Sequence, residues 1–444
     1  MSAPRQPSSA PVVSVEPPED PQDLKARFAA LAMLEAALAR RNGLEDALGS
    51  KIVTDLSPRD RAFARALAMA TLRHLGPIDQ AIQGKVTKAP PEAVFMLLRL
   101  GVAQLFHLDT PQFAAVTTTV EMAAARQPTR PFKNLVNAVL RGLTRDARPA
   151  PAPEAYAPPW LYARWRAAYG QAAADAIAAR ISEEPATDLT LRDPADGAEM
   201  AQALEAILLP GGTLRTEKRG DLAEWPGFGE GQWWVQDVAA AIPARLLALQ
   251  HGETALDLCA APGGKTLQLA ASGAVVTAVD RSGARLKRLS ENLARMNLTA
   301  EIVVADAAVW TDARTFDAVL LDAPCSSTGT FRRHPDVLWA ARAQDIAKLA
   351  AVQTQLLDAS ADRVKPGGRL VYCVCSLEPE EGEAQAAAFL ARRPDFEIAP
   401  PAAGEGGAPA EALAAAGTLR LSPALVEPQG GMDGFFVARF KRRA

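Results

Sequence analysis

The stretch ALDLCAAPGGKTLQLA, residues 255–270, decides the fold. Its apolar start predicts a strand that ends near Leu258, its small residues predict a turn, and a helix should begin at about Gly264. Small side chains let the backbone approach a ligand, and free N–H groups at a helix start favour an anionic or polar group. The pattern is not GxGxxG, and Cys259 stands where a GxxxxGK(S/T) loop needs its first glycine. A nucleotide P-loop is therefore excluded, and a dinucleotide site is disfavoured.

Strands and helices alternate from about Val235 to the end of the chain. The β-rich runs fall at residues 253–258, 274–279, 301–305, 316–322 and 368–374. Such alternation predicts a parallel, doubly wound α/β sheet over residues 235–444. In these sheets ligands bind beyond the carboxyl ends of the strands, and the loops discussed below all fall there.

Acidic residues follow the second and third of these strands. Asp280 stands 23 residues after Asp257, where an acid in a nucleotide-binding fold bonds ribose hydroxyls, and Asp306 ends the next strand. Acids at successive strand ends around a loop of small residues are typical of a site for a nucleoside-bearing cofactor, and S-adenosylmethionine fits as well as NAD. The alternative is that Asp280 and Asp306 only cap helices.

Four cysteines in a chain of 444 residues are too few for a disulfide framework. The chain lacks CxxC and Cys/His clusters, so we expect no metal site. Cys325 emerges with Asp322 at a strand end, and a cationic cluster of Arg332, Arg333 and His334 follows. These neighbouring residues favour a reactive Cys325 thiol over an inert buried one.

The segment RLVYCVCSLEPEEGE, residues 369–383, carries two further cysteines. Cys373 and Cys375 project to the same side of the predicted strand, but only Cys375 lies past its end. A helix is expected to begin near Pro379, and a helix start or a cation lowers the pKa of a neighbouring thiol. Cys375 is therefore the candidate nucleophile, and Cys373 is interpreted as a packing residue.

The N-terminal half is organised differently. Residues 1–22 are rich in Pro and Ser and are interpreted as a disordered tail, and residues 23–146 follow a helical pattern that predicts an all-α bundle. A Pro/Ala-rich linker is expected at 147–160. Residues 161–234 predict a small α+β subdomain, with a strand at 188–192 and a helix at 197–208.

The net charge of −3 does not indicate a nucleic-acid partner, so such a partner would have to bind a local basic patch. Residues 126–148 contain one acid, Asp146, and six basic residues: Arg126, Arg130, Lys133, Arg141, Arg145 and Arg148. This run is either a solvated helix face or a stripe that contacts phosphates. No stretch has the roughly 20 apolar residues of a membrane span, and none resembles a signal peptide, so a cytoplasmic protein is expected.

Three ordered motifs carry a family resemblance. DLCAAPGGKT, DAPCS followed by TG and RRHPD, and CS followed by PEE resemble the RNA cytosine-5 methyltransferases of the Sun/Fmu (RsmB-like) type. WWVQDVAA at 233–240 and GMDGFFVARF at 431–440 are similar to further segments of that family. Residues 23–145 resemble its NusB-like helical RNA-binding domain.

The resemblance implies a Rossmann-like domain that transfers a methyl group from S-adenosylmethionine to C5 of a cytidine in 16S ribosomal RNA. It implies Cys375 as the nucleophile that adds to C6, Cys325 as the group that assists product release, Asp322 against the cytosine N3/N4 edge or the cofactor, and Lys265 near both. It assigns these residues to the cofactor: Cys259, Ala260, Ala261, Pro262, Gly263, Gly264, Lys265, Asp280, Asp306 and Asp322. A monomer that binds RNA, with no metal and no membrane association, is expected.

One position departs from the family pattern. The family usually has Thr before the nucleophilic cysteine, and here Val374 replaces it, which removes a hydroxyl but leaves the thiol. DNA cytosine methyltransferases use the cysteine of a Pro-Cys loop instead, but Ser326 and the second thiol at Cys375 count against that arrangement. Two alternatives stay open: another RNA substrate such as tRNA, and an RNA-binding assembly factor without turnover.

Overall fold

The computed structural model describes residues 24–39, 43–146, 150–426 and 429–444. The expected tail at 1–22 lies outside these residues. The chain divides into two compact units. The helical unit extends to Glu184 and includes Phe331–Ala341, and the sheet unit comprises Pro185–Thr330 and Arg342–Ala444. The later part of the α+β subdomain expected at 161–234 therefore clusters with the large sheet, whereas its first helices, up to Glu184, belong to the helical unit.

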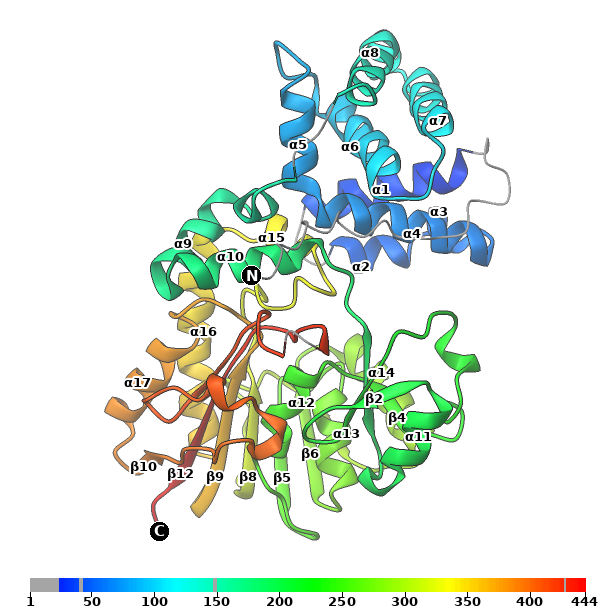
Figure 1. Ribbon diagram of the computed structural model, residues 1–444. Coiled ribbons are helices and arrows are strands. Elements are labelled where there is room, and N and C mark those ends of the chain that lie inside the picture. The colour runs from blue at the N-terminus through cyan, green and yellow to red at the C-terminus, as the bar shows by residue number, and fades with distance from the viewer. Residues whose placement is uncertain (1–23, 40–42, 147–149, 427–428) are drawn as a thin grey trace, which may run out of the picture. The chain divides into compact units, whose positions relative to one another are not determined.

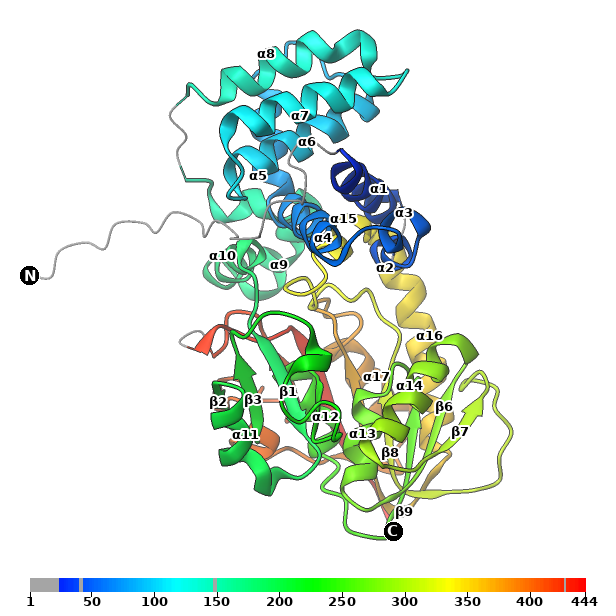
Figure 2. The ribbon, with the colours of Figure 1, turned by 90° about the vertical axis from the view of Figure 1, so that its right-hand side faces the viewer.

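The helical unit is all-α, as the apolar periodicity predicts. Its helices are α1 (Lys25–Ala39), α2 (Gly43–Leu48), α3 (Lys51–Thr54), α4 (Pro58–Arg73), α5 (Leu75–Gln83), α6 (Glu92–Phe106), α7 (Gln112–Ala125), α8 (Lys133–Leu143), α9 (Pro159–Tyr169), α10 (Gln171–Ala179) and α15 (Asp336–Ala340), with short 3-10 helices η1 (Arg130–Phe132), η2 (Pro153–Tyr156) and η3 (Arg180–Ser182). Figure 2 shows α6, α7 and α8 side by side. None of the described helices is both long and apolar enough to cross a bilayer.

Local sequence signals explain where these helices begin and pack. The Ser57 hydroxyl accepts a hydrogen bond of 3.2 Å from the backbone N–H of Asp60 and caps α4, which begins at Pro58 as the capping pattern predicts. Leu31 and Leu34 of α1 are fully buried in the core that the helices share.

The segment Phe331–Ala341 follows the Cys325 loop in sequence but packs within the helical unit. The Trp339 indole N–H donates a 3.2 Å hydrogen bond to the Leu72 carbonyl, and the Phe331 ring lies 6.1 Å from the Trp165 ring. Burial, with the neighbouring charge of Arg333, lowers the pKa of His334 to about 4. His334 is therefore neutral at pH 7, and its expected place in a cationic cluster is wrong.

A four-stranded antiparallel sheet in the order β2-β3-β1-β4 forms the small part of the sheet unit. Its elements are β1 (Thr187–Leu191), α11 (Gly197–Ala203), β2 (Ala206–Leu208), β3 (Thr213–Thr216) and β4 (Trp233–Val235). The expected helix at 197–208 is too long, because Glu205 has a φ of +50° and the chain then enters β2. A buried ion pair between Arg215 and Asp188 (2.6 Å) joins β3 to β1.

The large sheet has the order β10-β12-β9-β8-β5-β6-β7, with β11 paired to β12. The strands are β5 (Thr254–Leu258), β6 (Val275–Asp280), β7 (Glu301–Val304), β8 (Phe316–Asp322), β9 (Val364–Val374), β10 (Phe396–Ile398), β11 (Leu419–Leu421) and β12 (Phe435–Arg442). The five strands from β5 to β9 are parallel, which confirms the predicted doubly wound sheet, and the last three add an antiparallel edge.

Helices cover both faces of this sheet (Figure 1). One apolar layer joins the sheet to α12 (Val238–Arg245), α13 (Gly264–Ala271) and α14 (Gly283–Met296). The other joins it to α16 (Ala343–Ala361) and α17 (Glu383–Arg392). Buried residues of β5, β8 and β9 alternate between the two layers, as the period of a strand requires.

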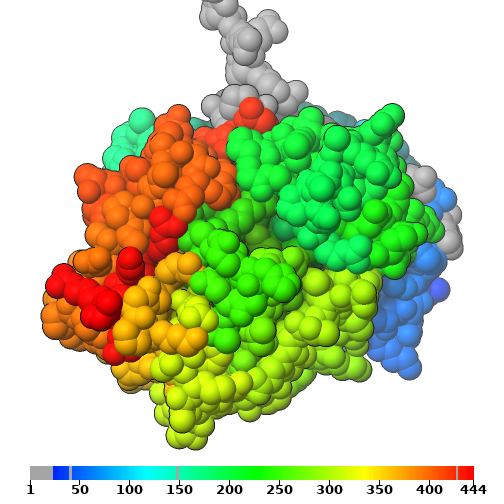
Figure 3. All heavy atoms as spheres, turned by 90° about the horizontal axis from the view of Figure 1, so that it is seen from below, coloured from blue at the N-terminus to red at the C-terminus, as the bar shows by residue number. Residues whose placement is uncertain are grey.

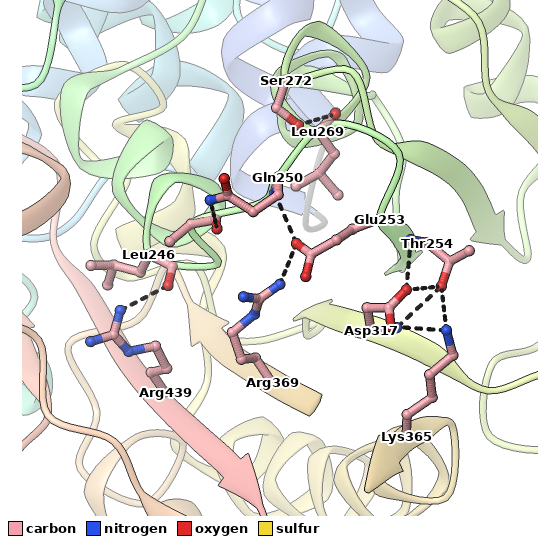
Figure 4. A network of polar contacts seen from close by, with 11 residues as sticks. Leu246, Gln250, Glu253, Thr254, Leu269, Ser272, Asp317, Lys365, Arg369 and Arg439 are labelled. Atoms are coloured by element: carbon pink, nitrogen blue, oxygen red, sulfur yellow. Dashed lines mark hydrogen bonds and ion pairs between the residues drawn. The ribbon is translucent and has the colours of Figure 1, made fainter. Parts of the chain in front are cut away.

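Polar contacts hold the amino ends of the strands, the side seen from below in Figure 3. The Asp317 carboxylate accepts hydrogen bonds from the Thr254 N–H (2.9 Å), the Thr254 hydroxyl (2.6 Å) and the Lys365 ammonium (2.8 Å) (Figure 4). A cavity of about 610 Å³ opens at this edge, lined among others by Thr277 and Arg314. No cysteine lines this cavity, and Cys325 and Cys375 follow the opposite, carboxyl ends of β8 and β9.

Candidate active site

Two thiols meet at the carboxyl ends of β8 and β9. The Cys325 Sγ lies 3.4 Å from the Cys375 Sγ, within the distance of a hydrogen bond between sulfur atoms. The Cys325 side chain is buried, and Cys375 is half-buried. The predicted positions are thus brought together from residues 50 apart in the sequence.

The environment of Cys375 favours its thiolate. The hydrogen bond from Cys325 is the largest influence and lowers the pKa of Cys375 below the usual range of a thiol, with smaller help from the Lys265 ammonium. Burial and the Asp322 carboxylate act in the opposite direction. The expected contribution of a helix start near Pro379 is wrong, because α17 begins only at Glu383.

An ion pair stands beside the thiols. The Lys265 ammonium donates to the Asp322 carboxylate at 2.7 Å, and it lies 5.3 Å from the centre of the Phe435 ring. Burial is the largest single influence and disfavours the Lys265 charge, but the attraction and hydrogen bond of Asp322, together with the nearby Cys373 and Cys375 sulfurs, outweigh it and raise the pKa of Lys265 above its ordinary value. Lys265 therefore stays a cation, and it approaches the thiols closely enough to influence the pKa of both Cys373 and Cys375.

Cys373 is a buried neighbour of this pair. Its side chain is fully buried, and its thiol donates to the second Asp322 oxygen at 3.4 Å. Burial, with the nearby Asp322 charge, raises the pKa of Cys373 well above that of an ordinary thiol, so it stays protonated. Val374 is also fully buried and packs in the apolar layer with Tyr372 and Phe436, an environment that suits valine.

The loop between β5 and α13 has the small residues that the sequence predicts for a turn. Gly263 has a φ of +113°, and a Cβ there would lie 2.4 Å from the Leu289 side chain, so only glycine fits. Ala260 and Ala261 are buried, and burial raises the pKa of Cys259 to about 12, so this thiol stays protonated at pH 7. The turn leads directly into α13 at Gly264, as the sequence predicts.

Acidic side chains surround this loop. Asp280, at the end of β6, accepts hydrogen bonds from the Ala261 N–H (3.1 Å) and the Ser282 N–H (2.8 Å). Asp257 is fully buried, and its Oδ1 has no hydrogen-bond partner among the residues that the structure describes. Burial raises the pKa of Asp257 to about 7. A buried oxygen without a partner beside a loop of small residues fits a polar ligand that would supply the missing contact.

Asp306 differs from the other expected cofactor residues. Its side chain is exposed, and it accepts a 3.0 Å hydrogen bond from the Ala308 N–H within its own turn. This contact matches the alternative of local capping, and a role toward the cofactor stays a prediction.

Comparison with known proteins shows the family of this chain. Residues 244–441 match the family model of the 16S rRNA methyltransferase RsmB/F, and residues 24–145 match the NusB family. Ribosomal RNA small subunit methyltransferase B of Vibrio cholerae is 37% identical over 401 residues, which cover 84% of this chain and 91% of that protein. The protein of the same name from Sodalis glossinidius is 39% identical over 366 residues, covering 77% and 83%. This chain belongs to the RsmB/F family.

Solved structures agree with this membership. The structure of PH0851 is 25% identical, has a TM-score of 0.76, and covers 95% of this chain and 99% of its own. NSun6 from Pyrococcus horikoshii, solved with SFG, shares the fold at 19% identity and a TM-score of 0.55, covering 65% of this chain and 98% of its own. This RsmB/F member is an S-adenosylmethionine-dependent RNA methyltransferase, and the loop at 259–264 with Asp257 and Asp280 fits that cofactor.

The sequence did not reveal one further member of this RsmB/F site. The Glu381 side chain is fully buried between the two cysteine loops. Its carboxylate accepts a 2.9 Å hydrogen bond from the Ser326 N–H and a 2.5 Å bond from the Ser376 hydroxyl. An acidic run usually indicates a solvated surface, so no sequence signal pointed to this position.

The NusB-like part carries most of the expected basic run. Arg130, Lys133, Arg141 and Arg145 are exposed on η1, α8 and the turn after it, while Arg126 forms a 3.1 Å ion pair with Glu35. Arg148 lies outside the described residues. The only acid of the run, Asp146, pairs with Lys85.

Proposed function

We propose that this protein methylates C5 of a cytidine in 16S ribosomal RNA through a covalent bond between Cys375 and C6 of the base. The observation that carries the proposal is the 3.4 Å contact between Cys325 and Cys375 at the carboxyl edge, beside the Lys265–Asp322 pair. The family model and the names of the relatives support small-subunit ribosomal RNA as the substrate.

The chemistry explains why a thiolate is needed. Cytosine C5 is too electron-poor to attack a methyl sulfonium unaided. When the Cys375 thiolate bonds to C6, the π electron pair of the C5–C6 double bond shifts toward C4, and negative charge develops at N3. A donor that stabilises this charge lowers the barrier, and the Lys265–Asp322 ion pair, which influences the pKa of Cys375, would supply it.

The second half of the reaction needs a base. S-adenosylmethionine supplies an electrophilic methyl group, and C5 accepts it as the carbon–sulfur bond of the donor breaks. The C5 proton must then leave, and its electron pair reforms the C5–C6 bond while the Cys375 sulfur departs. Cys325 contacts Cys375 directly and is placed to assist this release, through its own thiolate or through a water molecule.

The helical unit would hold the RNA. The exposed basic residues of η1 and α8 suit phosphate groups, which are bound through charge rather than sequence. The target cytidine must leave its stack before a thiol can reach C6. We infer that the NusB-like part contributes affinity and the sheet unit contributes chemistry.

A trapped adduct tests the proposal. The Cys325→Ala variant, incubated with S-adenosylmethionine and 16S ribosomal RNA, should give a protein–RNA band on a denaturing gel, because release is blocked. The Cys325→Ala/Cys375→Ala double variant is the matched control and should give no band. Absence of the band from the single variant, together with normal methylation by Cys375→Ala, would overturn the assignment.

A further inference from the structure

The loops that carry Cys325 and Cys375 are joined by a buried carboxylate. Glu381 accepts hydrogen bonds from the backbone N–H of Ser326 (2.9 Å) and the hydroxyl of Ser326, which are the groups directly after Cys325. It also accepts from the hydroxyl of Ser376 (2.5 Å), the residue directly after Cys375. One side chain therefore holds the residue that follows each cysteine.

Further contacts hold Glu381 itself in place. The Gln353 amide donates to Glu381 Oε1 at 3.1 Å and to the Pro324 carbonyl at 3.0 Å. The Tyr372 hydroxyl donates to the Glu381 carbonyl at 2.5 Å. The donors that the Glu381 carboxylate accepts from are neutral: the Ser326 N–H and hydroxyl, the Ser376 hydroxyl and the Gln353 amide. Such a network is rigid when complete and costly when a member is removed.

We propose that Glu381 is a positioning residue that sets the separation and orientation of the two cysteine side chains. This inference rests on the proposed function for its catalytic meaning, although its structural content can be measured without RNA. The backbone contributes as well, since the Gly329 N–H donates to the Cys375 carbonyl at 3.0 Å. Without Glu381 this backbone bridge, the direct contact of the Ser326 and Ser376 hydroxyls (3.0 Å), and the Thr328 contacts to Ser376, Leu377 and Glu378 would remain between the loops.

Replacement of Glu381 should act through the thiol pair. In Glu381→Ala the groups of Ser326 and Ser376 lose their common acceptor, and the loops can separate. The hydrogen bond from Cys325 is the largest influence that lowers the pKa of Cys375, so its removal should raise that pKa. A displacement of about 1 Å at a reacting atom can slow a reaction about 100-fold, and adduct formation should fall accordingly.

Glutamine offers a conservative test of geometry against charge. In Glu381→Gln the amide oxygen can still accept from the Ser326 N–H and from Gln353. The new amide N–H can donate to the Ser326 and Ser376 hydroxyls, which lie 3.0 Å apart and can reorient. Glu381→Gln should therefore retain most of the activity, whereas Glu381→Asp, whose chain is one carbon shorter, should lose about as much as Glu381→Ala.

The experiment measures the pH dependence of alkylation of Cys375 by iodoacetamide, quantified by peptide mass spectrometry in the full chain without RNA. Glu381→Ala and Glu381→Asp should move the midpoint upward by about one pH unit, the shift expected when a thiolate loses a hydrogen bond. Glu381→Gln and the exposed control Glu380→Gln should stay near the wild-type midpoint. S-adenosylmethionine affinity should be unchanged in all four variants.

Two results would overturn the inference. One is an unchanged midpoint in Glu381→Ala; the other is a Glu381→Gln variant as impaired as Glu381→Ala, which would show that the charge itself acts. If Glu381→Ala does not fold, the Ser326→Ala/Ser376→Ala double variant replaces it, with the same upward shift expected. A wild-type protein that forms no adduct with RNA but shows the shifted midpoint would refute the proposed function and leave this inference standing.

Discussion

Replacing Cys325 with alanine removes the main group that lowers the pKa of Cys375, so that pKa should rise. A hydrogen bond to a charged acceptor contributes about 1.5–3 kcal/mol. A thiol is a weak donor, so the lower end applies to the 3.4 Å contact between the sulfur atoms. Since one pKa unit corresponds to about 1.4 kcal/mol, the pKa of Cys375 should rise by about one unit in Cys325→Ala.

The rate of Cys375 alkylation should change less than the thiolate fraction of Cys375. At a pH below both pKa values the thiolate fraction of Cys375 falls about tenfold for one unit of pKa. The more basic thiolate is also the better nucleophile, with a Brønsted slope of about 0.4–0.5, so alkylation by iodoacetamide should slow only about three- to fourfold. Above the new pKa the variant should react faster than the wild type, because its thiolate is then fully formed.

The pH–rate curves of the wild type and of Cys325→Ala should cross, and such a crossing would show that Cys325 acts by lowering the pKa of Cys375. A Cys325→Ser control keeps a hydroxyl donor and should show less than half of the shift. Equal midpoints for the wild type and Cys325→Ala would refute the reasoning, since the contact with Cys325 would then not control the thiolate. A curve that is lower at every pH would instead indicate reduced access to Cys375.

Three further results are expected. Lys265→Met leaves Asp322 without its ammonium and should reduce methylation about 100-fold, measured as transfer of a labelled methyl group, while RNA affinity stays the same. The Lys365 hydrogen bond holds the pKa of Asp317 well below its usual range, so this carboxylate stabilises the fold above about pH 4 and ceases to do so as the pH falls further. Asp317→Asn should therefore be less stable at pH 7 by at most about 1 kcal/mol, because the pair is partly exposed, and its urea unfolding curve should converge with the wild type in acid. The third change replaces exposed basic residues of η1 and α8 with glutamine, namely Arg130, Lys133 and Arg141. The slope of log affinity against log salt concentration should become shallower by about 0.7 for each phosphate that is no longer neutralised. An unchanged slope would exclude these residues from the RNA interface.

Periodic burial is what made much of the fold predictable. The helix at 92–106 follows from apolar residues at helical spacing, and the five parallel strands follow from short runs that are buried on both faces. The predicted helix at 197–208 is wrong after Ala203, because the left-handed conformation of Glu205 is a local backbone event that no periodicity signals. The packing of Phe331–Ala341 within the helical unit depends on contacts distant in sequence, and it also could not be predicted.

The burial of Glu381 shows a different limit. Charged residues are almost never fully buried without partners, so an acidic run is reasonably interpreted as surface. Here the partners include the backbone N–H and hydroxyl of Ser326, which lies 55 residues away in the sequence, together with the Gln353 amide and the Ser376 hydroxyl. Only the folded arrangement shows that Ser326 and Ser376 face the same carboxylate.

The contact of the two thiols follows from strand order and register together. The sheet reverses its strand order between β5 and β8, so the loop of small residues after β5 and the Cys325 loop after β8 flank the switch point where such sheets bind ligands. β9 lies next to β8 with Asp322 paired to Cys373, so Cys325 and Cys375 stand only three and two residues beyond paired positions. A register shifted by one residue would turn the Cys375 side chain toward the opposite face of the sheet. The motifs single out Cys325 and Cys375 as candidates, and the pairing of β8 with β9 explains why their sulfur atoms meet.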